Sequence, residues 1–207
     1  MQVIPAINVD SFEEVKEKMG LVEPYVKWVQ LDVADGTFTK NTLWHDSTDL
    51  LSFKTSLNIE VHLMINDIEE RVESWLLEPV NRVIFHLETA KAPRLVIEKC
   101  KEAKKEVGIA IGPDTSWTQL IPFCTEVDVF QILSVYPGLP GQKFIEECLD
   151  KIKSLRENCP SVIIEVDGGV NKEVALKAKK AGADIICAAS AIFNSSDIKK
   201  AIKDLQV

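Results

Sequence analysis

The chain of 207 residues has no long apolar run and relatively few basic side chains. Its 24 Lys and Arg stand against 32 Asp and Glu, and the net charge of −8 argues against a surface that attracts nucleic-acid phosphates. No stretch reaches the roughly 18 apolar residues of a membrane span, and no basic segment followed by an apolar one marks a secretion signal. We expect a cytoplasmic protein with neither nucleic acid nor membrane as a partner.

Closely spaced cysteine pairs are absent as well. None of the five cysteines forms the CxxC motif of a redox or zinc site, and their number is odd. They lie far apart along the chain, at Cys100, Cys124, Cys148, Cys159 and Cys187. This pattern favours a reducing compartment.

Short apolar runs rich in Val and Ile alternate with longer stretches that have helical spacing and carry many Lys and Glu. The runs predict eight strands, at Gln2–Ile7, Trp28–Val33, Asn58–Leu63, Arg82–His86, Val107–Ile111, Val127–Leu133, Ser161–Val166 and Asp184–Ala188. The helical patterns lie at Phe12–Met19, Ile68–Leu77, Pro93–Lys105, Ile145–Arg156, Lys172–Ala181 and Ile198–Leu205. The link after the second strand and the Trp117–Cys124 link are less regular.

The predicted strands indicate a parallel sheet that is covered on both faces. Val162-Ile163-Ile164 and Ile185-Ile186-Cys187 are continuous apolar runs, as such strands require. A doubly wound open sheet would also alternate strands and helices, but no phosphate-binding GxGxxG follows the first strand. We therefore expect an α/β protein with one (β/α)8 TIM barrel, a closed parallel sheet of eight strands, as a single domain over residues 1–207.

Polar residues stand where several predicted strands end, at the face on which such barrels carry their active sites. Asn8 follows the first strand, and Gln30 and Asp32 lie two residues apart on the second and so share a face. His62 lies on the third strand and Asp167 follows the seventh. Two carboxylates and an imidazole suit zinc, iron, manganese or cobalt. Each residue alone could be a loop cap or a core histidine, but their joint position favours a site.

Five segments of the chain resemble the ribulose-phosphate 3-epimerase family, in the right order and spacing and nearly from end to end. They are Val29-Gln30-Leu31-Asp32-Val33-Ala34-Asp35-Gly36, Val61-His62-Leu63-Met64-Ile65, Ser134-Val135-Tyr136-Pro137-Gly138-Leu139-Pro140-Gly141-Gln142-Lys143-Phe144, Val166-Asp167-Gly168-Gly169 and Ser190-Ala191-Ile192-Phe193. No one of these segments would suffice, but together they are a specific signal.

The resemblance implies a sugar-phosphate 3-epimerase that interconverts D-ribulose 5-phosphate and D-xylulose 5-phosphate, or a related ketose phosphate, through a metal-stabilised enediolate. Asp32 and Asp167 are the implied acid–base pair, because inversion needs a proton carrier on each face of a planar intermediate. The implied ligands of the divalent cation are Asp32, His62 and Asp167. The family also implies a homo-oligomer, a dimer or larger.

Residues that would bind the sugar phosphate follow from the same resemblance and from the usual phosphate site of barrels after the seventh and eighth strands. Glycines let the main chain approach phosphate oxygens, and a helix that begins at Ser190 would add its positive end. Pro137–Gln142 is a candidate lid. The expected substrate- and phosphate-binding residues are Asn8, Met64, Gly138, Gly141, Gly168, Gly169, Ala189 and Ser190.

The chain departs from the family most seriously at Gln30, where the family has a histidine metal ligand. An amide oxygen coordinates a cation more weakly than an imidazole, so metal affinity is expected to fall. His45, in the loop after the second strand, could replace it, and His86 matches a family histidine near the site that orients its neighbours or packs. Other departures replace a serine, a methionine and two glycines, at Val9, Ala34, Pro140 and Ala189.

Two other functions are compatible with such a barrel. A metal-free phospho-sugar-binding barrel, which has lost or changed the epimerase activity, would agree with the substitution at Gln30. A decarboxylase of the orotidine-monophosphate type needs an Asp-x-Lys-x-x-Asp array, whereas the third strand offers Glu60-Val61-His62 with no lysine. We therefore set the decarboxylase aside and keep the binding barrel as the alternative.

Overall fold

Eight parallel strands form a closed barrel in chain order in the computed structural model, which describes residues 1–138 and 141–207. The strands are β1 Gln2–Ile7, β2 Trp28–Ala34, β3 Asn58–Met64, β4 Val80–His86, β5 Glu106–Ile111, β6 Val129–Leu133, β7 Ile163–Asp167 and β8 Ile185–Ala188. The bounds differ from the predicted ones by at most two residues. The predicted (β/α)8 barrel is confirmed.

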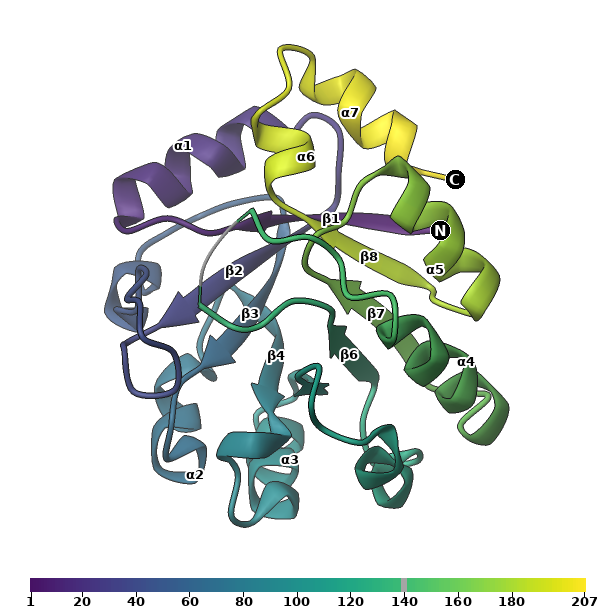
Figure 1. The fold of residues 1–207 in the computed structure, drawn as a ribbon. Coiled ribbons are helices and arrows are strands. Elements are labelled where there is room, and N and C mark those ends of the chain that lie inside the picture. The colour runs from purple at the N-terminus through teal and green to yellow at the C-terminus, as the bar shows by residue number, and fades with distance from the viewer. Residues whose placement is uncertain (139–140) are drawn as a thin grey trace.

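Helices surround the strands on the outside of the barrel (Figure 1). They are α1 Phe12–Val22, α2 Ile68–Arg71, α3 Pro93–Glu102, α4 Cys148–Asn158, α5 Lys172–Ala181, α6 Ser190–Phe193 and α7 Ile198–Leu205, with the 3-10 turns η1 Ser47–Leu50, η2 Val72–Trp75, η3 Leu87–Thr89 and η4 Trp117–Phe123. Polar side chains start several of them: Ser11 accepts the N–H of Glu14, and Asn171 accepts the N–H of Val174. In the described part of the chain, no helix is long and apolar enough to cross a membrane.

The single helix predicted over Ile68–Leu77 is wrong in its second half. The structure ends α2 at Arg71 and continues as the tighter turn η2. This turn buries Trp75, whose ring packs edge-on against Trp44 with 5.6 Å between the ring centroids. Apolar spacing over so few residues fits both an α-helical turn and a 3-10 turn, so the sequence pattern alone could not distinguish the two.

Both faces of the strands are buried, but the inner face is more polar than the apolar runs suggested. In β3, Ile59, Val61 and Leu63 belong to the apolar core, whereas Glu60 and His62 between them are also fully buried. The partners of Glu60 and His62 lie on other strands across the barrel interior. Alternation in this strand therefore separates an apolar outer face from a polar inner one.

Two cysteines that are distant in the sequence meet in the structure. Cys124 follows η4 and Cys159 follows α4, and the two are joined by a disulfide with their Cα atoms 5.4 Å apart. The sequence pattern did not predict this pair, because the ends of η4 and α4 come together only in the closed barrel. Cys100, Cys148 and Cys187 are free and buried.

Candidate active site

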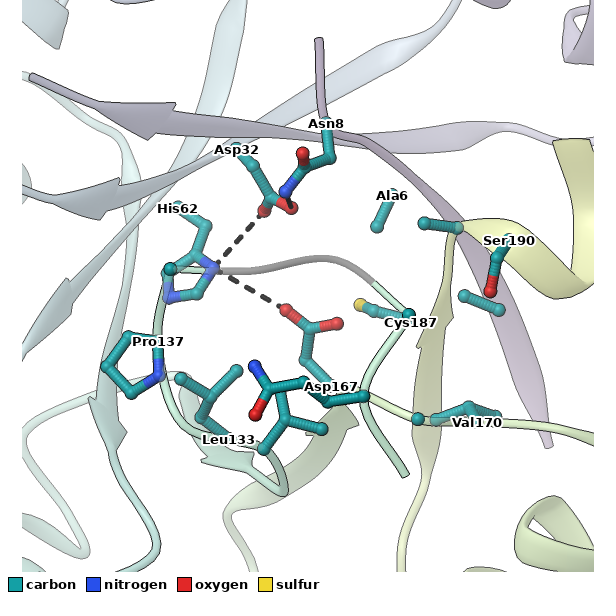
Figure 2. A pocket seen from close by; sticks show the side chains of 18 of the residues that line it. Ala6, Asn8, Asp32, His62, Leu133, Pro137, Asp167, Val170, Cys187 and Ser190 are labelled. Atoms are coloured by element: carbon teal, nitrogen blue, oxygen red, sulfur yellow. Dashed lines mark hydrogen bonds and ion pairs between the residues drawn. The ribbon is translucent and has the colours of Figure 1, made fainter. Parts of the chain in front are cut away.

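The carboxyl ends of β2, β3 and β7 bring Asp32, His62 and Asp167 together. Parallel pairing sets Asp32 directly opposite His62, and Asp167 is the last residue of β7. The Nδ1 atom of His62 lies 3.3 Å from Oδ1 of Asp32 and 3.5 Å from Oδ2 of Asp167, as the dashed lines in Figure 2 mark. The three residues predicted from strand ends are therefore one cluster.

A pocket of about 440 Å³ opens above this cluster, at the end of the barrel where the strands stop. His62 and Ser190 lie on opposite sides of it (Figure 2). Asn8 lines the pocket beside Asp32 and donates to its Oδ2 over 3.3 Å. The expected substrate-binding residues Asn8, Met64, Gly138, Gly141, Gly168, Gly169, Ala189 and Ser190 all line the pocket.

A second histidine, His86 at the end of β4, contacts the side of the His62 ring that faces away from the carboxylates. The Nε2 atoms of His62 and His86 are 2.8 Å apart, so one of them carries the proton and the other accepts it. On its other side, Nδ1 of His86 lies 3.2 Å from Oε2 of Glu88, whose other oxygen accepts the N–H of Gly112 over 2.7 Å. This chain of contacts restrains the plane of the His62 ring, and the orienting role of His86 stays a prediction.

The buried charges shift the titration of these groups. Burial raises the pKa of Asp32, and the charge of Asp167 adds to the shift. Burial opposes the charged form of His62, but hydrogen bonds to Asp167 and Asp32 raise its pKa to about 10. Burial lowers the pKa of His86. The two carboxylates therefore favour the protonated form of His62.

Gln30 lies below the carboxylates with its amide nitrogen toward both of them. Its Nε2 donates to Oδ1 of Asp32 over 2.7 Å and to Oδ2 of Asp167 over 2.9 Å, and its Oε1 accepts from Nε2 of Gln131 over 2.8 Å. The reverse orientation would set an oxygen against two carboxylates and a nitrogen against a nitrogen. Hydrogen bonding therefore fixes Gln30 as a donor that presents no lone pair to a cation.

Two consecutive glycines, Gly168 and Gly169, line the pocket after β7. Gly168 and Gly169 have φ angles of +99° and +64°, which side chains with a Cβ rarely adopt. A Cβ on Gly169 would also come within 2.8 Å of the Cα of Phe144. At Ala189 φ is −101°, so alanine is tolerated at this position, where the family has a glycine.

Comparisons with known proteins agree with this geometry. The model of the ribulose-phosphate 3 epimerase family matches residues 2–193. The chain belongs to the ribulose-phosphate 3-epimerase family. It is 34% identical to the ribulose-phosphate 3-epimerase of Chlamydia trachomatis over 88% of this chain and 82% of that protein. The Methanocaldococcus jannaschii ribulose-phosphate 3-epimerase is also 34% identical, over 94% of this chain and 83% of that protein.

A solved 3-hexulose-6-phosphate synthase has the same fold. It superposes with a TM-score of 0.74 over 100% of this chain and 98% of that one, at 17% identity. An orotidine 5'-phosphate decarboxylase from Pyrococcus horikoshii superposes with a TM-score of 0.67 at 18% identity, over 99% of this chain and 97% of that one. At such low identity the likeness concerns the fold alone. The epimerase family makes the chain an enzyme of the isomerase class.

The donors of this epimerase-family site fit a divalent cation. One ligand atom from each of Asp32, His62 and Asp167 lies within 4.8 Å of the other two, and all three side chains are buried. Two carboxylate oxygens and an imidazole nitrogen are the donors expected for a borderline metal. His45 does not join them: its side chain is exposed and its Nδ1 lies 2.5 Å from the carbonyl oxygen of Leu43.

The remaining departures from the family have different surroundings. Val9 is buried, and its carbonyl accepts the N–H of Trp44 over 2.8 Å. Ala34 packs with Met64 in a small apolar cluster at the pocket edge. Pro140 lies outside the described residues, so the loop predicted as a lid is described only on either side of it.

A deeper polar layer that the motifs did not reveal lies below Gln30. Arg82 contacts Oε2 of Glu60 over 2.7 Å and lies 3.8 Å from Oε2 of Glu165, while Gln131 donates to Oε1 of Glu165 over 2.8 Å. Burial and the neighbouring Glu165 raise the pKa of Glu60 well above its usual range. The available signal was a charged or amide side chain in the middle of a mostly apolar strand, as at Glu60, Gln131 and Glu165. Glu60, Glu165 and Cys187 could also hold a metal ion, but the guanidinium of Arg82 already supplies positive charge there.

The left-handed backbone at Gly169 leads to a first prediction. Gly169→Ala is expected to lower the free energy of unfolding by about 2–4 kcal/mol, because the new Cβ meets a left-handed backbone and the main chain of Phe144. Urea denaturation measures the change. Gly20→Ala in α1 is the matched control, since a Cβ there has nothing within 4 Å and should be neutral or slightly stabilising. Equal stability of the two variants would contradict the prediction.

Proposed function

We propose that this epimerase-family enzyme interconverts D-ribulose 5-phosphate and D-xylulose 5-phosphate, or epimerises a closely related ketose phosphate at C3. The observation that supports this is the pair of buried carboxylates, Asp32 and Asp167, which β2 and β7 bring within 3.3 Å and 3.5 Å of the Nδ1 atom of His62 at the base of the pocket. A pocket of about 440 Å³ is large enough for a sugar phosphate of this size.

In the proposed reaction, one carboxylate removes the proton from C3, and the electron pair of the broken C–H bond moves into an enediolate. The other residue, which starts the cycle as a protonated carboxylic acid, then donates its proton to C3 from the opposite face, which forms a new C–H bond with inverted configuration and leaves a carboxylate. Asp32 and Asp167 exchange these roles when the reaction runs backwards. Asn8 and Gln30 hold Asp32 by hydrogen bonds to its two oxygens, and Gln30 also holds Asp167.

We propose that Asp32, His62 and Asp167 hold a divalent cation, which when bound polarises the substrate carbonyl and stabilises the developing oxyanion. Zinc, iron, manganese and cobalt all suit two carboxylates and an imidazole. Gln30, as a hydrogen-bond donor to both carboxylates, is not proposed as a fourth ligand. The phosphate is proposed to bind the main chain at Gly168, Gly169, Ala189 and Ser190.

The decisive experiment follows deuterium exchange at C3. Purified protein is incubated with D-ribulose 5-phosphate in D2O, both with added Mn²⁺ or Co²⁺ and after chelator treatment, and NMR detects deuterium at C3 and the appearance of xylulose 5-phosphate. We expect both. Absence of exchange under every metal condition, together with saturable binding of the sugar phosphate, would favour the alternative of a phospho-sugar-binding barrel.

Several broader expectations remain predictions. They are a single functional domain over residues 1–207, a homo-oligomer, a cytoplasmic location and the absence of nucleic-acid or membrane partners. Analytical ultracentrifugation of the purified protein would test the oligomer.

A further inference from the structure

The pocket contains a basic side chain, Lys18, to which the proposed reaction gives no role. Asp32 and Asp167 bring negative charge to its base, and a substrate phosphate adds more. Among the described residues that line the pocket, Lys18 is the sole Lys or Arg. It lies in α1, an element that none of the family motifs includes, and its side chain is partly buried.

Lys18 lies at the phosphate side of the pocket, remote from His62. Its Nζ is 4.9 Å from the centroid of the Phe193 ring. Phe193 ends α6, the short helix that begins at Ser190, and both residues line the pocket. Figure 2 places Ser190 on the side opposite His62. The ammonium group is therefore held next to the segment that is proposed to bind phosphate.

No acidic side chain neutralises Lys18 in the described part of the chain. Its neighbour in the same helix, Lys16, is paired with Glu13 at 2.6 Å. Lys18 lies instead over the face of the Phe193 ring, which positions a cation without cancelling its charge. Such an ammonium remains available to an anion that enters the pocket.

Among the described residues, the rest of the proposed phosphate site carries no full positive charge. Glycine N–H groups offer only partial charges, and α6 has 4 residues, too few for a strong helix dipole. A dianionic phosphate that enters a pocket with two carboxylates gains most from a nearby ammonium. We propose that Lys18 binds the phosphate group of the substrate and so selects phosphorylated over unphosphorylated ketoses. This inference rests on the proposed epimerase function.

The test compares Lys18→Met with wild type, with Lys16→Met as the matched control on the same helix. We expect the KM for D-ribulose 5-phosphate to rise roughly tenfold or more in Lys18→Met, while kcat changes less than about threefold, because one charge-assisted contact to the non-reacting end is lost. Competitive inhibition by inorganic phosphate should weaken by a similar factor. Lys18→Arg should recover most of the affinity, and Lys16→Met should behave as wild type.

Isothermal titration with inorganic phosphate separates this inference from the proposed function. If wild type binds phosphate more tightly than Lys18→Met but epimerises nothing, the proposed function fails and the role of Lys18 stands. Equal KM and equal phosphate affinity in wild type and Lys18→Met would overturn the role of Lys18 alone. A merely structural role would lower Tm and kcat without a selective change in phosphate affinity. Lys18→Gln replaces Lys18→Met if the latter does not fold.

Discussion

Replacement of Asp167 by Asn is expected to lower kcat for epimerisation by roughly 10²–10⁴-fold, the usual contribution of one positioned acid–base group. Asn has the size of Asp and can still accept the hydrogen bond from the Gln30 amide, so the fold should persist. It cannot carry the proton. Asp32→Asn is expected to have an equally large effect, because inversion at one carbon needs a proton carrier on each face.

The two variants should nevertheless fail differently. Each keeps the carboxylate on one face, so in D2O each should exchange the C3 proton of one epimer without converting it to the other. Asp167→Asn should exchange the C3 proton of one epimer and Asp32→Asn that of the other. Each variant is incubated separately with ribulose 5-phosphate and with xylulose 5-phosphate, and NMR shows which of the two sugars takes up deuterium. Metal content is measured in parallel, so that loss of a cation is not mistaken for loss of a proton carrier.

Asp204→Asn, a change on the surface of α7, is the control and should keep full activity. Full turnover in either active-site variant would contradict the two-carboxylate reaction. Exchange of the same epimer by both variants would contradict the assignment of one carboxylate to each face.

Most of the fold was predictable because its strands are buried on both faces. Val and Ile gather in such strands, and the runs at Gln2–Ile7 and Asn58–Met64 stand out from the charged helices between them. The nature of short turns was less accessible. The helical spacing after Ile68 predicts one helix, but burial of Trp75 favours a tighter turn that only the tertiary structure selects.

The site was predictable where strand ends and family motifs coincide, as at Asp32, His62 and Asp167. It was not predictable where an orientation depends on a distant partner. Gln30 presents nitrogen because Gln131, 101 residues away in sequence, donates to its oxygen. That contact depends on the register and closure of the whole barrel, which no local pattern contains.

Lys18 was missed for a related reason. It is one of two lysines in an ordinary amphipathic helix, and nothing in its spacing distinguishes it from Lys16. Its contact with Phe193 requires the start of the chain to pack against α6, close to its end. In a barrel closed by pairing of β1 with β8, such contacts between the first and last units form only after the fold is complete.

Gln30→His is expected to raise the affinity for Co²⁺ or Zn²⁺ by roughly 100-fold or more, since even loss of a residue that only supports a metal ligand commonly changes affinity 10- to 100-fold. The present amide presents N–H groups to both carboxylates, whereas an imidazole nitrogen has a lone pair for the cation. The surroundings can accept the change. Oε1 of Gln131 is buried and has no hydrogen-bond partner among the described residues, and rotation of the Gln131 amide, whose Nε2 now faces residue 30, would turn this oxygen toward the second imidazole nitrogen.

Titration with Co²⁺, followed by its visible absorption and by competition with a chelator, measures this affinity without reference to activity. Gln30→Leu is the matched control: it removes the amide donors without adding a ligand, so it should not reproduce the gain. His45→Gln should leave the affinity of wild type unchanged, because the loop histidine is exposed and bonded to Leu43. Equal affinity in Gln30→His and wild type would mean that Gln30 can turn its oxygen to the cation at little cost, and the fixed orientation inferred from Gln131 would then be wrong.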